Sequence, residues 1–277
     1  MSAWLAWLGL APFFVFGVAF EVIPVVTLLR SSLTKDGALT LNHFERAMTP
    51  LVIDSFRNSI QLSVATALLG VVFGTIVAYA IVTARRAFIR NALTALADVT
   101  TNFGGAPLAF AFIVTLGSTG ILTLVLKEIG INLYPTFRIY SITGLTIAYL
   151  YFQLPLMILL IIPSLLGLRR EWREAAINLG ASSAQYWRRI ALPILAPSLL
   201  GGFLLLFANS FGAYATAWTL TGPDVNLVTV QIAALVRGEV QLDPGLADAV
   251  AMLSLLIMAL CVAGYQWLSG RAWKAAR

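Results

Sequence analysis

Long apolar runs separated by short polar segments make up most of this chain. Five runs hold at least about 18 mainly apolar residues, and a sixth is interrupted by polar and small residues. Each can cross the roughly 30 Å hydrocarbon core of a bilayer as a helix, because a spanning segment must satisfy its own backbone hydrogen bonds. The pattern predicts an all-α integral membrane protein with six transmembrane helices, near 5–29, 58–84, 94–117, 141–166, 194–218 and 246–268.

Polar residues inside the third and fifth runs are candidates for a path across the membrane. Asn102 begins the interruption of the third run, and the fifth run carries Asn209, Tyr214 and Thr216. Asn209 and Thr216 are seven residues apart and align on one helical face, whereas Tyr214 lies off that line. These side chains either line a polar path or make hydrogen bonds between helices, and both interpretations remain open.

The polar stretch from Glu174 to Pro193, EAAINLGASSAQYWRRIALP, has the features of a helical hairpin. Residues 169–179 favour a helix, and Gly180 suits the left-handed position after its end. Ser182-Ser183-Ala184-Gln185 has the capping-box pattern that begins a second helix, which we expect Pro193 to break. We also expect the adjacent small residues 175 and 176 to expose a nearly bare backbone to a groove. An amphipathic loop lying on lipid headgroups is the alternative.

The amino-acid composition agrees with a membrane location, and the placement of the basic residues indicates which loops face the cytoplasm. The chain is 60% apolar and 11% charged, with a mean hydropathy of +0.89, against about 25% charged residues in a soluble domain. The net charge of +6 comes mainly from arginines in short loops, so we read it as loop sidedness rather than as a signal for nucleic acid. An orientation with both termini inside puts the larger share of the 18 basic residues in cytoplasmic loops.

Residue types that carry chemistry are scarce. The chain has one histidine, one cysteine and no G-x-x-x-x-G-K-[ST] sequence, which is the phosphate-binding loop of many ATPases. We therefore expect no catalytic site, no metal site and no cofactor bound by this chain. A membrane-embedded enzyme is a remote alternative, because it would need a nucleophile with a base or a metal cluster.

The hairpin resembles the EAA loop of permease subunits in binding-protein-dependent ABC importers. The residues at the family's spacing are Glu174, Ala175, Ala176, Gly180, Ile190, Leu192 and Pro193. The resemblance covers roughly residues 56–268 and implies the type I importer permease fold. It also implies that the hairpin, between the fourth and fifth transmembrane helices, is a cytoplasmic coupling helix that docks in a cleft of an ATPase.

The same resemblance implies partners, a location and a class of cargo. An ATPase dimer would hold ATP and magnesium, a second permease, homologous or identical, would complete the pathway, and a periplasmic or lipid-anchored binding protein would deliver the solute across a bacterial inner membrane. The stretch 207–220 looks like the spermidine/putrescine branch, with iron(III), thiamine, aminoethylphosphonate or another small solute as alternatives. The domains expected are 1–55, an added helix and external loop; 56–268, the permease core; and 269–277, a basic cytoplasmic tail.

Overall fold

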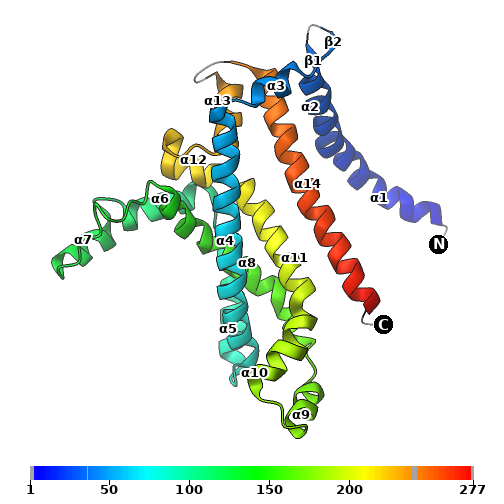
Figure 1. The fold of residues 1–277 in the computed structure, drawn as a ribbon, viewed down its shortest axis with the longest axis vertical. Coiled ribbons are helices and arrows are strands. Elements are labelled where there is room, and N and C mark those ends of the chain that lie inside the picture. The colour runs from blue at the N-terminus through cyan, green and yellow to red at the C-terminus, as the bar shows by residue number, and fades with distance from the viewer. Residues whose placement is uncertain (1–2, 36, 239–241, 276–277) are drawn as a thin grey trace. The chain divides into compact units, whose positions relative to one another are not determined.

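The computed structural model describes residues 3–35, 37–238 and 242–275, with side chains from 10 to 267 outside the two gaps (Figure 1). The elements follow in this order: α1 Ala3–Gly17, the π-turn η1 Val18–Val22, α2 Ile23–Leu33, β1 Thr34–Lys35, β2 Ala38–Leu39, α3 Asn42–Ala47, α4 Pro50–Thr83, α5 Ala87–Thr101, α6 Gly105–Leu116, α7 Ile121–Glu128, α8 Ile142–Leu166, α9 Arg170–Asn178, α10 Ser183–Tyr186, the π-turn η2 Trp187–Ala191, α11 Leu192–Phe211, α12 Ala215–Thr221, the 3-10 turn η3 Gly222–Asp224, α13 Val228–Arg237 and α14 Pro244–Ala275. Contacts divide the chain into one unit of residues 1–56 with 231–257 and another of 57–230 with 258–277.

Six helices in the described part of the chain are long and apolar enough to cross a membrane, which confirms the predicted fold class. They are Leu10–Leu33, Pro50–Thr83, Gly105–Glu128, Ile142–Leu166, Ser183–Phe211 and Pro244–Trp267. Within the first and fifth of these spans, π-turns join consecutive α-helices.

The third and fifth spans differ most from the predicted ranges, and the second begins at Pro50, eight residues before the predicted start. The third was expected over 94–117, but α5 ends at Thr101 and the apolar span begins at Gly105 and runs through α6 and α7. The predicted interruption is confirmed. The shift arises because α5 has 15 residues before the break, too few to cross the hydrocarbon core, whereas the apolar span after the break runs on to Glu128. The fifth was expected over 194–218, but its helix ends at Phe211 and the chain turns through Gly212 before α12 begins.

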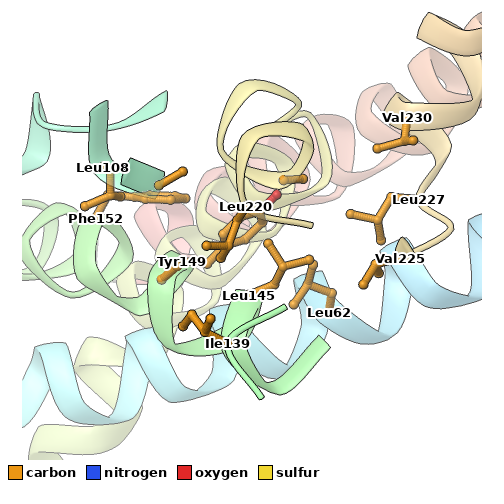
Figure 2. Close-up of a cluster of buried hydrophobic side chains, with 13 residues drawn as sticks. Leu62, Leu108, Ile139, Leu145, Tyr149, Phe152, Leu220, Val225, Leu227 and Val230 are labelled. Carbon is orange, nitrogen blue, oxygen red and sulfur yellow. The ribbon is translucent and has the colours of Figure 1, made fainter. Parts of the chain in front are cut away.

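The core of the larger unit surrounds α8 (Figure 2). Tyr149 and Leu145 of α8 are fully buried, together with Leu62 of α4, Leu108 of α6 and Leu220 of α12. Buried polar side chains also join the helices. The amide of Gln153 donates to the Leu206 carbonyl at 2.8 Å, and the hydroxyl of Thr66 donates to that of Ser210 at 3.0 Å. Such bonds satisfy polar groups that lipid could not.

Glycine allows three membrane helices to approach closely at one point. Met157 of α8 lies between Gly74 of α4 and Gly202 of α11. A Cβ atom added at Gly74 would stand 2.7 Å from the Met157 Cβ, and one at Gly202 would stand 2.6 Å from the Met157 sulfur. Both separations are shorter than van der Waals contact, so small residues are required for this packing.

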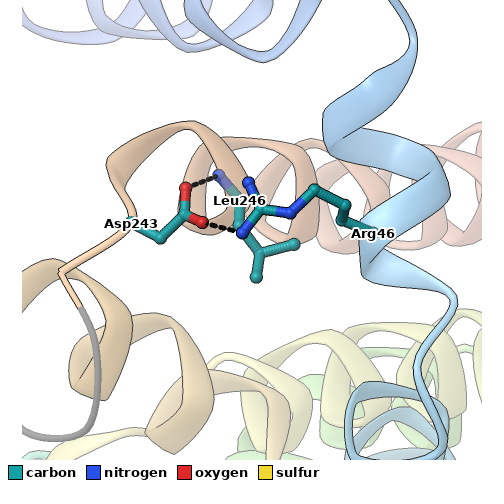
Figure 3. A network of polar contacts seen from close by, with 3 residues as sticks. All are labelled: Arg46, Asp243 and Leu246. Carbon is teal, nitrogen blue, oxygen red and sulfur yellow. Dashed lines mark hydrogen bonds and ion pairs between the residues drawn. The ribbon is translucent and has the colours of Figure 1, made fainter.

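In the smaller unit, an ion pair joins α3 to the start of α14 (Figure 3). Arg46 of α3 pairs with Asp243, whose other carboxylate oxygen accepts a hydrogen bond from the Leu246 N–H at 3.1 Å. The ring of His43 packs so closely on Gly245 that a Cβ there would overlap it. Burial raises the pKa of Asp243, but the Leu246 N–H, Arg46 and His43 outweigh it, so the net pKa lies below its ordinary value.

Candidate functional site

The first half of the hairpin ends in a Schellman motif. Gly180 has φ +79°, the left-handed conformation that glycine adopts without strain. Its N–H bonds to the Ile177 carbonyl and the N–H of Ala181 bonds to the Ala176 carbonyl, each at 2.9 Å. These two bonds define the motif and satisfy carbonyls at the end of α9. The prediction for Gly180 is confirmed.

The second half begins with the predicted capping box. The hydroxyl of Ser182 accepts from the Gln185 N–H at 3.3 Å, while the Gln185 side-chain oxygen accepts from the Ser182 N–H at 2.8 Å. These reciprocal bonds start α10. The hairpin is therefore shaped by bonds between residues close in sequence.

Pro193 does not break the second helix, contrary to the prediction. The helix continues from α10 through η2 into α11, and Pro193 lies in the first turn of α11. In η2 the N–H of Leu192 bonds to the carbonyl of Trp187, five residues earlier. This wider turn resets the register, so that proline enters where a missing N–H costs little. The hairpin is thus continuous with a membrane helix.

Ala176 lies inside the hairpin rather than on its surface. With Tyr186 and Ala191 it forms a small buried cluster, and Ile190 packs against this cluster. The prediction that residues 175 and 176 both expose bare backbone is wrong for Ala176, because α9 folds back onto the second helix. Ala175 is exposed as expected.

The outer surface of the hairpin carries apolar side chains that sequence reasoning missed. Leu179 is 88% exposed, Ile177 is 55% exposed and Leu192 is 47% exposed, and Glu174 is exposed in α9. Of these, only Leu192 and Glu174 were predicted from the family spacing. The sequence did offer a signal for Ile177 and Leu179, since they are large apolar residues within a polar loop. Exposed apolar side chains of this kind mark interaction surfaces.

An aromatic contact connects the hairpin to α4. The ring of Trp187 meets the ring of Tyr79 edge to face, with centroids 5.1 Å apart. Trp187 also packs against the buried cluster of the hairpin. The hairpin therefore contacts α4 and is continuous with α11.

All four residues predicted for a path line one cavity of about 520 Å³, here called the polar pocket. Two helix breaks form it: Asn102 comes from the break between α5 and α6, and Tyr214 from the break between α11 and α12, while Asn209 and Thr216 flank the second break. The hydroxyl of Thr216 donates to the Gly105 carbonyl at 3.3 Å and joins the two breaks. Irregular backbone at membrane depth is tolerated where it lines such a cavity.

The polar pocket offers hydrogen bonds without fixed charge. Among the residues that the structure describes, its lining consists of uncharged side chains and backbone. The amide of Asn102 donates to the Asp98 carbonyl at 3.0 Å, and Asn209 is exposed. The ring of Tyr214 stacks on that of Trp218 with centroids 6.1 Å apart. Such a lining can contact a polar solute without holding it through an ion pair.

The family is decided by a match over residues 70–274 to the model of the binding-protein-dependent transport system inner membrane component. The chain belongs to this family. The permease is therefore a multi-pass membrane transport subunit and not an enzyme, and ATP hydrolysis falls to a partner ATPase.

Relatives of the permease are named for several cargoes. It is 23% identical over 207 residues to a probable sulfate transport system permease protein of Helicosporidium sp., covering 75% of this chain and 73% of the relative. It is 27% identical over 218 residues to the spermidine/putrescine permease PotB of Haemophilus influenzae, covering 76% of each. It is also 30% identical over 166 residues to the thiamine permease ThiP of Escherichia coli, covering 60% of this chain and 30% of that protein. These relatives do not single out the polyamine branch.

Solved structures support the same fold. A bacterial ABC transporter involved in the import of the acidic polysaccharide alginate matches with a TM-score of 0.75 at 18% identity, covering 97% of this chain and 96% of that one. At this identity the likeness establishes the fold of the permease alone.

Proposed function

We propose that this permease carries a small polar solute through the polar pocket and couples its passage to a cytoplasmic ATPase dimer through the hairpin. The observation that carries the proposal is a capped hairpin whose second helix continues without a break into α11, which supplies Asn209 to the polar pocket. One continuous element therefore connects the proposed docking surface with the proposed path.

The hairpin supplies a surface suited to a cleft in the ATPase. Leu179, Ile177 and Leu192 present apolar side chains, and Glu174 adds a charge that can pair with a basic wall. The buried cluster around Ala176 keeps the two helices together while the outer residues bind. ATP and magnesium belong to the ATPase in this arrangement, and both termini of the permease lie on the cytoplasmic side.

A second permease, homologous or identical, completes the path, as the resemblance to binding-protein-dependent importers implies. A periplasmic or lipid-anchored binding protein delivers the solute. Relatives that match more than two thirds of each chain are named for different cargoes, among them sulfate and spermidine/putrescine. Spermidine or putrescine is the first candidate cargo, because the sequence of residues 207–220 resembles the spermidine/putrescine branch. The uncharged pocket lining favours sulfate or another oxyanion as the second candidate, because a polyamine site is expected to contain acids.

The test uses the complete transporter reconstituted in proteoliposomes. We expect a Glu174→Lys, Gly180→Trp double variant to lose substrate-stimulated ATPase activity and transport while its membrane helices stay folded. An Asn209→Leu, Thr216→Val variant should keep ATPase association and lose transport. Unchanged coupling in the first variant would refute the docking role, and unchanged transport in the second would refute the path.

The cargo is tested separately, by calorimetry on the binding protein encoded with this permease. Spermidine, putrescine, sulfate, molybdate and thiamine are each titrated. Binding of a polyamine alone supports the first candidate, whereas binding of sulfate or molybdate alone replaces it with an oxyanion.

A further inference from the structure

Five arginines surround one cavity beside the hairpin, here called the arginine cavity. It has a volume of about 480 Å³, within the roughly 300–1,000 Å³ typical of ligand pockets. The arginines come from three segments that meet here: the end of α4, the start of α5, and the turn into α9. They are Arg85, Arg90, Arg169, Arg170 and Arg173.

These positive charges have no acidic partner within the arginine cavity. No ion pair of these five arginines is found among the described residues, and the pair of Arg46 with Asp243 lies in the other unit. Glu171 and Glu174 share α9 with Arg170 and Arg173 but do not line the cavity. Like charges held together repel one another, and an anion would relieve that repulsion.

The walls of the arginine cavity match the boundary between lipid and water. Tyr79 and Trp187 supply aromatic rings, and Val82, Leu165 and Leu168 supply apolar surface. Tyrosine and tryptophan are enriched at this boundary, and basic pockets between transmembrane helices bind anionic headgroups. Guanidinium groups bind phosphate oxygens through paired hydrogen bonds.

A second cavity adjoins the first and has a different lining. It has a volume of about 680 Å³, and both Val82 and Arg90 line it as well as the arginine cavity. The other lining residues from α4 and α8 are Ile81, Leu159, Ile162 and Leu166, and α5 contributes a wall with Ala95, Asn91, Thr94 and Asp98. An arginine-lined space thus opens beside one whose α4 and α8 walls are aliphatic and whose α5 wall is polar, here called the apolar cavity after its aliphatic walls, with Arg90 at the boundary.

We propose that the arginine cavity binds the phosphate group of an anionic phospholipid, with one acyl chain in the adjoining apolar cavity. A free phosphate would explain the arginines, but it would leave the apolar cavity without a role. The proposal does not depend on the cargo or on the polar pocket. It makes the hairpin, through Arg169 to Arg173 and Trp187, sensitive to the charge of the lipid leaflet that it faces.

The alternative is that these arginines serve only to orient the loops. The chain offers a matched control for this. Arg86 is next to Arg85, and Arg188 and Arg189 follow Trp187, yet none of the three lines the arginine cavity. An Arg86→Gln, Arg188→Gln, Arg189→Gln variant therefore removes the same charge from the same loops as an Arg85→Gln, Arg169→Gln, Arg173→Gln variant.

The test is native mass spectrometry of the full-length permease, released from detergent after incubation with equal amounts of phosphatidylglycerol and phosphatidylcholine. We expect the cavity variant to retain at least about tenfold less phosphatidylglycerol than the wild type, and the control variant to stay within about twofold. Thermal unfolding of both variants establishes that each is folded. Equal losses in the two variants, or no loss in either, would overturn the proposal.

An Ile162→Trp variant tests the lipid source, because it fills the apolar cavity without removing an arginine. We expect it to lower phosphatidylglycerol retention while inorganic phosphate raises the unfolding temperature of this variant as much as that of the wild type. Unchanged phosphatidylglycerol retention in this variant would overturn the lipid assignment. So would a cavity variant that keeps phosphatidylglycerol but no longer copurifies with the ATPase, since the arginines would then bind a protein.

Discussion

The hydroxyl of Tyr149 donates a 2.7 Å hydrogen bond to the backbone carbonyl of Ala213. Tyr149 is fully buried in α8, and Ala213 lies in the break between α11 and α12 that borders the polar pocket. A helix break leaves a carbonyl without its usual partner, and in a membrane protein that partner must come from another side chain. One buried tyrosine therefore stabilises the irregular backbone on which the pocket depends.

Replacing Tyr149 by phenylalanine removes this donor with little change in shape. We expect a loss of about 1–3 kcal/mol in unfolding free energy, because the Ala213 carbonyl is left without its partner. Thermal unfolding in detergent measures the loss of stability. The transport rate should also fall, because the backbone that borders the polar pocket is less stable. Tyr151→Phe is the control, since no hydrogen bond of its hydroxyl is found among the described residues. Equal effects of the two changes would contradict the role of Tyr149.

Alanine should be tolerated unequally at the two glycines that contact Met157. At Gly74 the added Cβ meets the Met157 Cβ and the Leu154 carbonyl, which cannot move without the backbone. At Gly202 it meets the flexible end of the Met157 side chain. We expect Gly74→Ala to cost about 1–3 kcal/mol and Gly202→Ala less than about 1 kcal/mol. The unfolding temperatures of the two variants, measured in the same detergent, test this difference. A larger loss of stability in Gly202→Ala than in Gly74→Ala would refute this packing.

Gly180→Ala should loosen the hairpin without a steric clash. No atom lies within 4 Å of an added Cβ, so the cost is the left-handed backbone alone, about 1–2 kcal/mol. We expect amide exchange in 176–186 to accelerate by about five- to thirtyfold. Gly167→Ala, at a right-handed position with φ −73°, is the control. Unchanged exchange in Gly180→Ala would show that the Schellman motif does not limit opening of the hairpin.

Leu179→Asp should separate docking from folding. Because Leu179 is 88% exposed, we expect its replacement to change unfolding free energy by no more than about 0.5 kcal/mol. Affinity for the ATPase should fall at least about tenfold, since an apolar side chain that docking would bury becomes a charge. Copurification of the ATPase at graded concentrations measures this. Leu39→Asp, at an 84% exposed position on β2, is the control and should keep full affinity.

Acid should weaken the connection between α3 and α14. The Leu246 N–H and Arg46 outweigh burial and hold the pKa of Asp243 below its ordinary value. The stabilisation is therefore present above the unfolded pKa of about 3.9 and is lost as pH falls through the lower folded value. We expect the unfolding temperature of the wild type to drop more steeply below about pH 4 than that of Asp243→Asn. Parallel curves would contradict a contribution from this carboxylate.

Much of the hairpin could be predicted because its bonds are local. Gly180 and the Ser182–Gln185 capping box form bonds within a few residues, and these residue types are the ones that each type of helix cap requires. The failures at Pro193 and Ala176 have non-local causes. The π-turn η2 shifts the helical register so that Pro193 lies in the first turn of α11, and the burial of Ala176 depends on how α9 packs onto Tyr186.

The sequence by itself determined the six apolar spans, the helix break at Asn102 and the caps of the hairpin, because hydrophobicity and capping depend on neighbouring residues. Only the tertiary structure decided that Asn102 and Asn209 line one cavity, and that arginines from three segments surround another. Residues so far apart along the chain meet only through helix packing, which depends on the combined shape of all the helices and is not encoded in any single segment.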